Sequence, residues 1–117
     1  MSKYLSVKDF DLTAIGNYFE LQEIRDNIDK DTGEILGHYY DCKILDGEYK
    51  KRWVTVRVDN YNRNLTNDDI VNFEQVIVCF SDLEVSAIMP RRHEGLRVFY
   101  VAQAITVEKL IPDETNY

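Results

Sequence analysis

Apolar and polar residues alternate along much of this chain, and a period of two is typical of strands that bury one face. The alternation is clearest in residues 53–59, where Val54, Val56 and Val58 share one face. Trp53 and Arg57 then share the opposite face, because successive side chains of a strand point to opposite sides. The pattern predicts a strand with an apolar inner face and an aromatic, basic outer face.

Two earlier segments, residues 18–28 and 35–45, carry strand patterns of the same kind. Residues 29–34 lie between them and have the composition of a turn, in which Gly33 can adopt the positive φ that other residues avoid. Asp46 and Gly47 begin a second turn that leads to residue 53. The first half of the chain is therefore predicted to form an antiparallel meander of three strands.

The second half begins with a short helix at residues 66–73. Thr66 can cap it, and Asp68 and Asp69 place negative charge at its N-terminus, where the helix dipole favours it. Residues 76–80 are continuously apolar, which predicts a strand buried on both faces.

A last strand is predicted at residues 97–108, although its end at residues 102–105 is also compatible with a helical turn. Residues 86–95 contain Pro90, Arg91 and Arg92 and are predicted to be a polar loop between the last two strands.

The order of three strands, one helix and two strands is that of the OB-fold, a partly open barrel of five strands. We therefore predict a mainly β protein, with a five-stranded OB-fold-like barrel and one short helix between strands 3 and 4. An SH3-like barrel, or another small β-barrel with a helix, is the alternative. The length of 117 residues fits a single domain, here residues 1–110, followed by a short acidic tail at residues 111–117.

Composition supports a folded protein, with 44% hydrophobic and 30% charged residues. The longest apolar run, residues 76–80, is far shorter than the roughly 20 residues that span a bilayer. The N-terminal residues also lack the apolar stretch of a signal peptide. We expect a cytoplasmic protein with no membrane partner.

Motifs that suggest catalysis have simpler interpretations. Asp31-Thr32-Gly33 is the tripeptide of aspartic proteases, but charged neighbours crowd it and no apolar strand leads to it, whereas the catalytic carboxylate must be buried beside a second one. The four carboxylates that would suggest a metal-dependent nuclease are explained by helix capping and solvated loops. They are Asp68, Asp69, Asp82 and Glu84.

Metal sites have equally little support. A calcium loop starting at Asp29 would require Gly and Glu at the positions that Glu34 and Tyr40 occupy. The two cysteines lie in apolar segments, where they are most simply core residues, and the two histidines are not spaced as zinc ligands. We expect no enzyme, no metal and no cofactor.

The formal net charge of -7 argues at first against nucleic-acid binding, which is driven by basic residues. The charge is segregated, however. Residues 38–63 hold six basic and four acidic residues together with five aromatic rings, and residues 91–104 hold three basic residues and one acidic residue. The acidic excess lies in residues 1–34, 64–90 and 105–117.

The alternation indicates where these basic and aromatic residues point. Tyr40, Cys42 and Ile44 are expected to face the barrel interior, which leaves Tyr39 and Lys43 outside, beside the outer residues of the valine-rich strand. Rings that stack on bases and cations that follow the backbone are what single-stranded nucleic acid requires. The candidate nucleic-acid-binding residues are Tyr39, Lys43, Lys50, Lys51, Arg52, Trp53, Arg57, Tyr61, Arg63, Arg91 and Arg92. The competing interpretation is that Trp53 packs under a loop or in an oligomer interface and that the basic residues are ordinary surface.

The chain also resembles small OB-fold proteins of Gram-positive phages and conjugative elements, among them phage single-stranded DNA-binding proteins and a helicase-processivity family. The resemblance covers about residues 15–110. It lies in Gly16 with the aromatic pair that follows, the turn and Tyr-rich strand of residues 33–45, the strand of residues 53–58, and the Tyr-Val-Ala-x-Ala-Ile segment of residues 100–105.

The resemblance implies sequence-independent binding of single-stranded DNA during replication, recombination or transfer, by a dimer or larger homo-oligomer, with replication or recombination proteins as further candidate partners. Two rivals stay open. One is an acidic DNA mimic or interaction module that inhibits or recruits a DNA-processing enzyme, which the net charge favours. The other is a virion or protein-interaction β-module.

Overall fold

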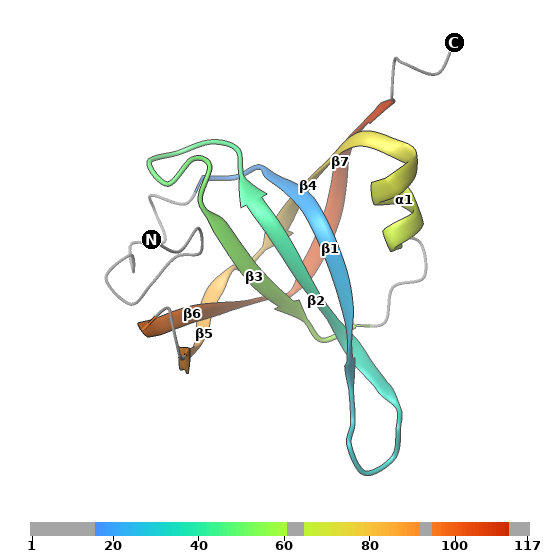
Figure 1. Cartoon of the computed structure of the whole chain (residues 1–117), viewed down its shortest axis with the longest axis vertical. Coiled ribbons are helices and arrows are strands. Elements are labelled where there is room, and N and C mark those ends of the chain that lie inside the picture. The colour runs from blue at the N-terminus through green and yellow to red at the C-terminus, as the bar shows by residue number, and fades with distance from the viewer. Residues whose placement is uncertain (1–15, 61–64, 92–94, 113–117) are drawn as a thin grey trace.

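The computed structural model of the chain describes residues 16–60, 65–91 and 95–112. Its elements, in chain order, are β1 (Phe19–Ile28), β2 (Ile35–Ile44), β3 (Trp53–Val58), α1 (Asn67–Asn72), β4 (Phe73–Ser81), β5 (Glu84–Arg91), β6 (Gly95–Ala102) and β7 (Ala104–Pro112). The described strands form one curled sheet in the order β5-β6-β3-β2-β1-β4-β7 (Figure 1). The predictions of a mainly β, barrel-like fold with one short helix between the third and fourth strands are confirmed.

The described residues form seven strands rather than five, because the last predicted strand, residues 97–108, is bent into β6 and β7, and the segment predicted as a loop contributes β5. Asp82 and Leu83 separate β4 from β5, and Gln103 separates β6 from β7. Antiparallel pairing continues on both sides of the bend, between Ser81 and Ala104 and between Glu84 and Val101. The bent hairpin is therefore one unit, and the two ends of the sheet, β5 and β7, belong to it.

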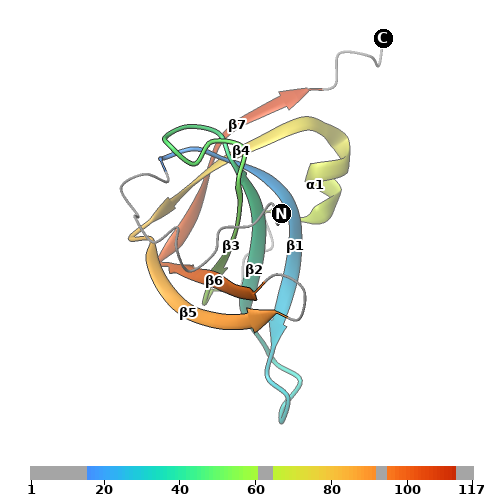
Figure 2. The same cartoon turned by 60° about the vertical axis from the view of Figure 1, so that its left-hand side comes forward.

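This bent hairpin closes the barrel. Its β6 half pairs in parallel with β3, and its β4 half pairs antiparallel with β1. Figure 2 shows β5 and β6 curving across the lower part of the barrel, while β4 and β7 lie to the upper left of the meander. The bend at Asp82 has a positive φ of 53°, and the amide of Gln103 donates a hydrogen bond of 2.9 Å to the carbonyl of Ser81.

Two predictions for the second half of the chain were wrong, and one alternative left open there is excluded. Residues 86–95 are not a loop, because most of them belong to β5 and β6; Pro90 lies on β5, which ends the sheet order, and proline is tolerated on such an edge strand. Residues 102–105 are not helical, since β7 begins at Ala104. Residues 76–80 are not buried on both faces: Val76 and Val78 are buried, whereas Ile77, Cys79 and Phe80 are partly exposed.

The interior is built from the inward faces of the strands, as the alternation predicts. Val54, Val56 and Val58 are buried, and so are the predicted inward residues of β2. Among the residues whose burial the structure describes, the buried hydrophobic ones are Phe19, Leu21, Ile24, Tyr40, Cys42, Ile44, Val54, Val56, Val58, Leu65, Val76, Val78, Tyr100 and Ala102. On β1 a register shift between Leu21 and Glu23 inserts one extra residue, which lets Ile24 point inward again.

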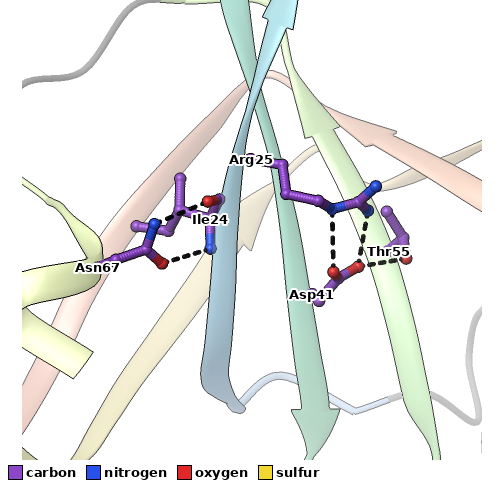
Figure 3. A network of polar contacts seen from close by, with 5 residues as sticks. All are labelled: Ile24, Arg25, Asp41, Thr55 and Asn67. Carbon is purple, nitrogen blue, oxygen red and sulfur yellow. Dashed lines mark hydrogen bonds and ion pairs between the residues drawn. The ribbon is translucent and has the colours of Figure 1, made fainter. Parts of the chain in front are cut away.

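Helix α1 starts where the sequence predicts, with the amide of Thr66 donating to the carboxylate of Asp69 at 2.9 Å. Its first residue, Asn67, also completes the barrel. The Asn67 carboxamide accepts from the amide of Ile24 and donates to its carbonyl, both at 2.9 Å (Figure 3). Because β4 pairs with β1 only at Phe19 and Glu20, this side chain supplies backbone partners farther along β1.

Tyr40 gives a test of the barrel interior. Its hydroxyl is buried with no hydrogen-bond partner among the described residues, and burial, aided by nearby Cys42, raises its pKa to about 12. The folded protein keeps this phenol protonated while the unfolded chain ionises near pH 10, so stability is lost as the pH rises through this interval. We expect wild type to lose about 2 kcal/mol more than Tyr40→Phe between about pH 9 and pH 11.5, in urea unfolding followed by circular dichroism. Equal losses in both proteins would contradict this placement of the ring.

Candidate nucleic-acid interface

The outer face of β2 and β3 carries the side chains that the sequence selects. The register pairs Tyr39 with Arg57, Asp41 with Thr55, and Lys43 with Trp53. The three β2 residues of these pairs alternate with the buried residues Tyr40, Cys42 and Ile44, and the three β3 residues alternate with the buried valines of that strand. All six therefore point outward. The predicted outward orientation of Tyr39, Lys43, Trp53 and Arg57 is therefore confirmed, and all four are partly exposed.

Strand β1 extends each pair into a row across three strands. Its residues Glu20, Glu23 and Arg25 stand opposite Lys43, Asp41 and Tyr39. The rows are Glu20–Lys43–Trp53, Glu23–Asp41–Thr55 and Arg25–Tyr39–Arg57. The first and third rows are four residues apart along β2, which is about 13 Å at strand spacing.

In the third row, two arginines flank an aromatic ring. The guanidinium carbon of Arg25 lies 5.5 Å from the centroid of the Tyr39 ring. On the other side of Tyr39, Arg57 of β3 forms an ion pair with Asp59 at 2.9 Å, and the side chains of both residues remain more than one-third exposed. This row presents a ring and two cations to solvent.

The middle row is occupied by a buried carboxylate that the sequence does not select. Asp41 is only 5% exposed. Its carboxylate accepts from Nε and Nη2 of Arg25, at 3.1 and 3.0 Å, and from the hydroxyl of Thr55 at 2.6 Å (Figure 3). The negative charge is therefore shielded from solvent and balanced by one guanidinium.

In the first row, Lys43 and Trp53 lie side by side, and Glu20 is engaged elsewhere. The Glu20 carboxylate accepts hydrogen bonds from the side-chain amides of Gln22 and Gln75, so it is held toward β4. Lys43 and the indole of Trp53 consequently form the end of the face that is nearest the turn between β2 and β3.

That turn, residues 45–52, carries the predicted basic cluster. Lys50 and Lys51 are exposed, and Arg52 is partly buried. The amide of Lys51 donates to the carbonyl of Ile44 at 2.8 Å, and Lys51 has a positive φ of 76°. Because the turn leaves directly from the Lys43–Trp53 row, it extends the basic, aromatic face past the end of the strands.

Asp46 anchors the same turn to the start of β1. Its carboxylate accepts from the amides of Asn17 and Tyr18, at 3.0 and 2.7 Å. Gly16 has a φ of +88°, and a side chain there would lie 2.3 Å from the carbonyl oxygen of Asp46. The tight approach of these two segments fixes the turn beside the barrel.

Four candidates remain. Arg91 is the last residue of β5, which is separated from β3 by β6. Tyr61, Arg63 and Arg92 lie outside the described residues.

Acidic residues gather at the opposite end of β3 from the basic turn. A pocket of about 290 Å³ is lined there by Asp59, Asn60, Asp82, Glu84, Val101, Ala102 and Gln103. Within residues 16–60, 65–91 and 95–112, no group of three or more His, Cys, Asp or Glu side chains has the arrangement of a metal site. Carboxylates therefore gather at the far end of β3, next to Arg57, which pairs with Asp59, while the exposed lysines of the 45–52 turn lie at the other end of the strand.

Residues missed by the sequence analysis are Arg25, Asp41 and Thr55. The only signal was the placement of Asp41 on a strand, between Tyr40 and Cys42, where aspartate is uncommon. Its partner Arg25 could not be identified without the register shift on β1.

No helix within the described part of the chain is long and apolar enough to span a membrane. Comparisons with protein-family models, with curated proteins and with solved structures find no match to this chain.

Proposed function

We propose that the protein binds single-stranded DNA without sequence preference, along the outer face of β2 and β3. The observation that carries the proposal is the pairing of Tyr39 with Arg57 and of Lys43 with Trp53, which places a ring and a cation in each of two rows on one face. Every base has a flat face that can stack on a ring, and cations follow the phosphates, so this arrangement does not depend on base sequence.

Single strands fit this face better than duplexes do. Tyr39 and Trp53 stand on neighbouring strands with their side chains partly exposed, and they need bases whose faces are free. The two rows are separated by about 13 Å along the strands, so bases stacked on both rings would belong to one extended strand. The exposed lysines of the 45–52 turn continue the basic track beyond Trp53.

The biological setting is proposed from the resemblance to phage and conjugative-element proteins. In that setting the protein protects or presents single-stranded DNA during replication, recombination or transfer, acting as a homo-oligomer. It acts by binding alone, with no catalytic step, metal or cofactor.

Trp53 makes the proposal directly testable, because it is the single tryptophan of the chain. We expect oligo(dT) to quench its fluorescence at low salt, and a duplex of equal length to have a much smaller effect. The affinity for oligo(dT) should fall steeply as salt is raised, because counterions are released when cations bind phosphates. Absence of quenching at low salt would contradict the proposal.

The carboxylates around the pocket at the end of β3 favour one rival function. Asp59, Asp82 and Glu84 lie together there, and the net charge of the chain is -7. An acidic surface of this kind suits a DNA mimic that occupies the site of a DNA-processing enzyme. Such a protein would bind a nuclease or restriction subunit and would show no affinity for oligonucleotides.

A further inference from the structure

Arg25 lies beside the proposed DNA track, on a strand that contributes none of the predicted site residues. We infer that Arg25, held in place by Asp41, forms with Tyr39 a subsite for one nucleotide of the bound strand. Arg25 would contact both the base and a phosphate, and Asp41 would act as a positioning residue. This inference rests on the proposed function and adds β1 to the binding face.

The orientation of Arg25 is fixed from one side. Asp41 accepts from Nε and Nη2 at 3.1 and 3.0 Å, a two-pronged contact that holds the guanidinium plane as well as its position. A guanidinium has five N–H donors, so this contact leaves three for other acceptors. The Arg25 side chain is 46% exposed, whereas that of Asp41 is 7% exposed. The donors that remain can therefore reach a ligand while the carboxylate cannot.

Tyr39 gives the subsite its aromatic part. The Arg25 guanidinium lies 5.5 Å from the centroid of this ring, and both groups present flat surfaces on which a base can stack. Arg57 stands on the far side of Tyr39, two strands from Arg25 and thus about 10 Å away. A DNA strand that runs along β2 past Tyr39 would therefore have one arginine on each side of it.

The contacts of the buried Asp41 carboxylate indicate that it orients Arg25. Burying a charge is expensive, and an apolar pair of similar volume often stabilises a fold as well. An acidic residue at the centre of a surface for a polyanion is also unfavourable unless it performs a task there. Here it accepts from Arg25 and Thr55, and by doing so it sets the direction in which Arg25 presents its free donors.

Two Arg25 variants and one control test the subsite, with binding of labelled oligo(dT) measured by fluorescence anisotropy over a range of salt concentrations. We expect Arg25→Ala to weaken binding about tenfold and to reduce the slope of log K against log salt by about 1. Arg25→Lys keeps the charge but lacks the plane and the fork, so we expect the slope to be retained and the affinity to fall about fivefold. Lys109→Ala is the matched control, because Lys109 lies on β7, at the end of the sheet and away from β2 and β3, and this variant should bind with wild-type affinity.

Asp41→Asn provides the sharpest contrast. If only net charge mattered, removing a carboxylate from this face would strengthen DNA binding. If Asp41 positions Arg25, binding should weaken severalfold although the protein has become less acidic. Thermal unfolding of each variant establishes that the comparison is between folded proteins. Arg25→Lys tests the role of the guanidinium while keeping a cation beside the buried Asp41 carboxylate.

The outcomes distinguish this inference from the proposed function. If oligo(dT) quenches the Trp53 fluorescence of the wild-type protein but both Arg25 variants bind oligo(dT) with affinities within twofold of wild type, the subsite is refuted and the proposed function stands. Tighter binding by Asp41→Asn refutes the positioning role. If wild type does not bind oligo(dT) at all, both the proposed function and the subsite are refuted.

Discussion

Replacing Trp53 with alanine should weaken the binding of single-stranded DNA about 10- to 100-fold. The indole is the larger of the two outward rings and stands beside Lys43, and stacking of one base on such a ring contributes about 1–3 kcal/mol. Because the substitution removes the only tryptophan, the measurement is anisotropy of a labelled oligo(dT).

Two further variants define what this loss means. Trp53→Phe retains a flat ring and should recover most of the affinity, while Lys43→Ala should weaken binding modestly and lower the salt slope by about 1. Trp53 is partly buried, so the melting temperature of each variant must be recorded beside its affinity. Wild-type affinity in a folded Trp53→Ala protein would show that the indole has another role, such as packing in an oligomer.

The largest loss of stability is expected from Gly37→Ala, a substitution that a strand pattern alone would regard as harmless. A β-carbon at this position in β2 would lie 2.2 Å from the carbonyl oxygen of Val58 and 2.9 Å from the α-carbon of Asp59. Both are backbone atoms, so no side chain can rotate away. We expect a loss of about 3 kcal/mol or more in the free energy of unfolding, measured in urea.

Gly33→Ala is the matched control for this prediction. Gly33 has a φ of +74°, but a β-carbon there meets no atom within 4 Å. The cost is therefore limited to placing an L-residue in the left-handed region, about 1 kcal/mol. A larger loss for Gly33→Ala than for Gly37→Ala would contradict the close approach of β2 and the end of β3.

The contrast between these glycines shows what a sequence can reveal. The turn glycine was recognisable, because Gly33 lies among Asp, Lys and Thr residues where the chain must reverse. Gly37 lies inside a strand pattern, and its importance depends on the carbonyl of Val58, which only the folded barrel brings near. Local conformation was predictable at one position, and a tertiary contact was not predictable at the other.

The same distinction applies to the candidate site. The outward direction of Tyr39, Lys43, Trp53 and Arg57 followed from alternation alone, since each strand must bury its apolar face. The Asp41–Arg25 contact was not predictable, because it depends on the register of β1, which the extra residue between Leu21 and Ile24 shifts. A single sequence does not reveal such a shift.

The barrel closure was likewise only partly predictable. Five segments of strand pattern predicted a barrel. The two bends, at Asp82–Leu83 and at Gln103, contain no proline or glycine that would mark them in the sequence. The bends are set by the need of one hairpin to pair with β1 at one end and β3 at the other. The Asn67 carboxamide that pairs with β1 is also a consequence of the closed barrel rather than of local sequence.

The net charge of -7 is compatible with the proposed function because of where the charges lie. The basic turn stands at one end of β3 and the carboxylate-lined pocket at the other. The net charge lowers the long-range attraction to DNA, whereas the separation of the charges leaves a local cationic track intact.

The most direct test of the proposed binding face is a backbone amide NMR titration of the protein with oligo(dT). The largest shifts are expected for Tyr39, Lys43, Trp53 and Arg57, together with the Trp53 indole N–H. The shifts should extend into the 45–52 turn and be small along β7. Binding that instead perturbs β4 and β7 and leaves Tyr39, Lys43, Trp53 and Arg57 unshifted would contradict the assignment of the outer face of β2 and β3 as the DNA-binding surface.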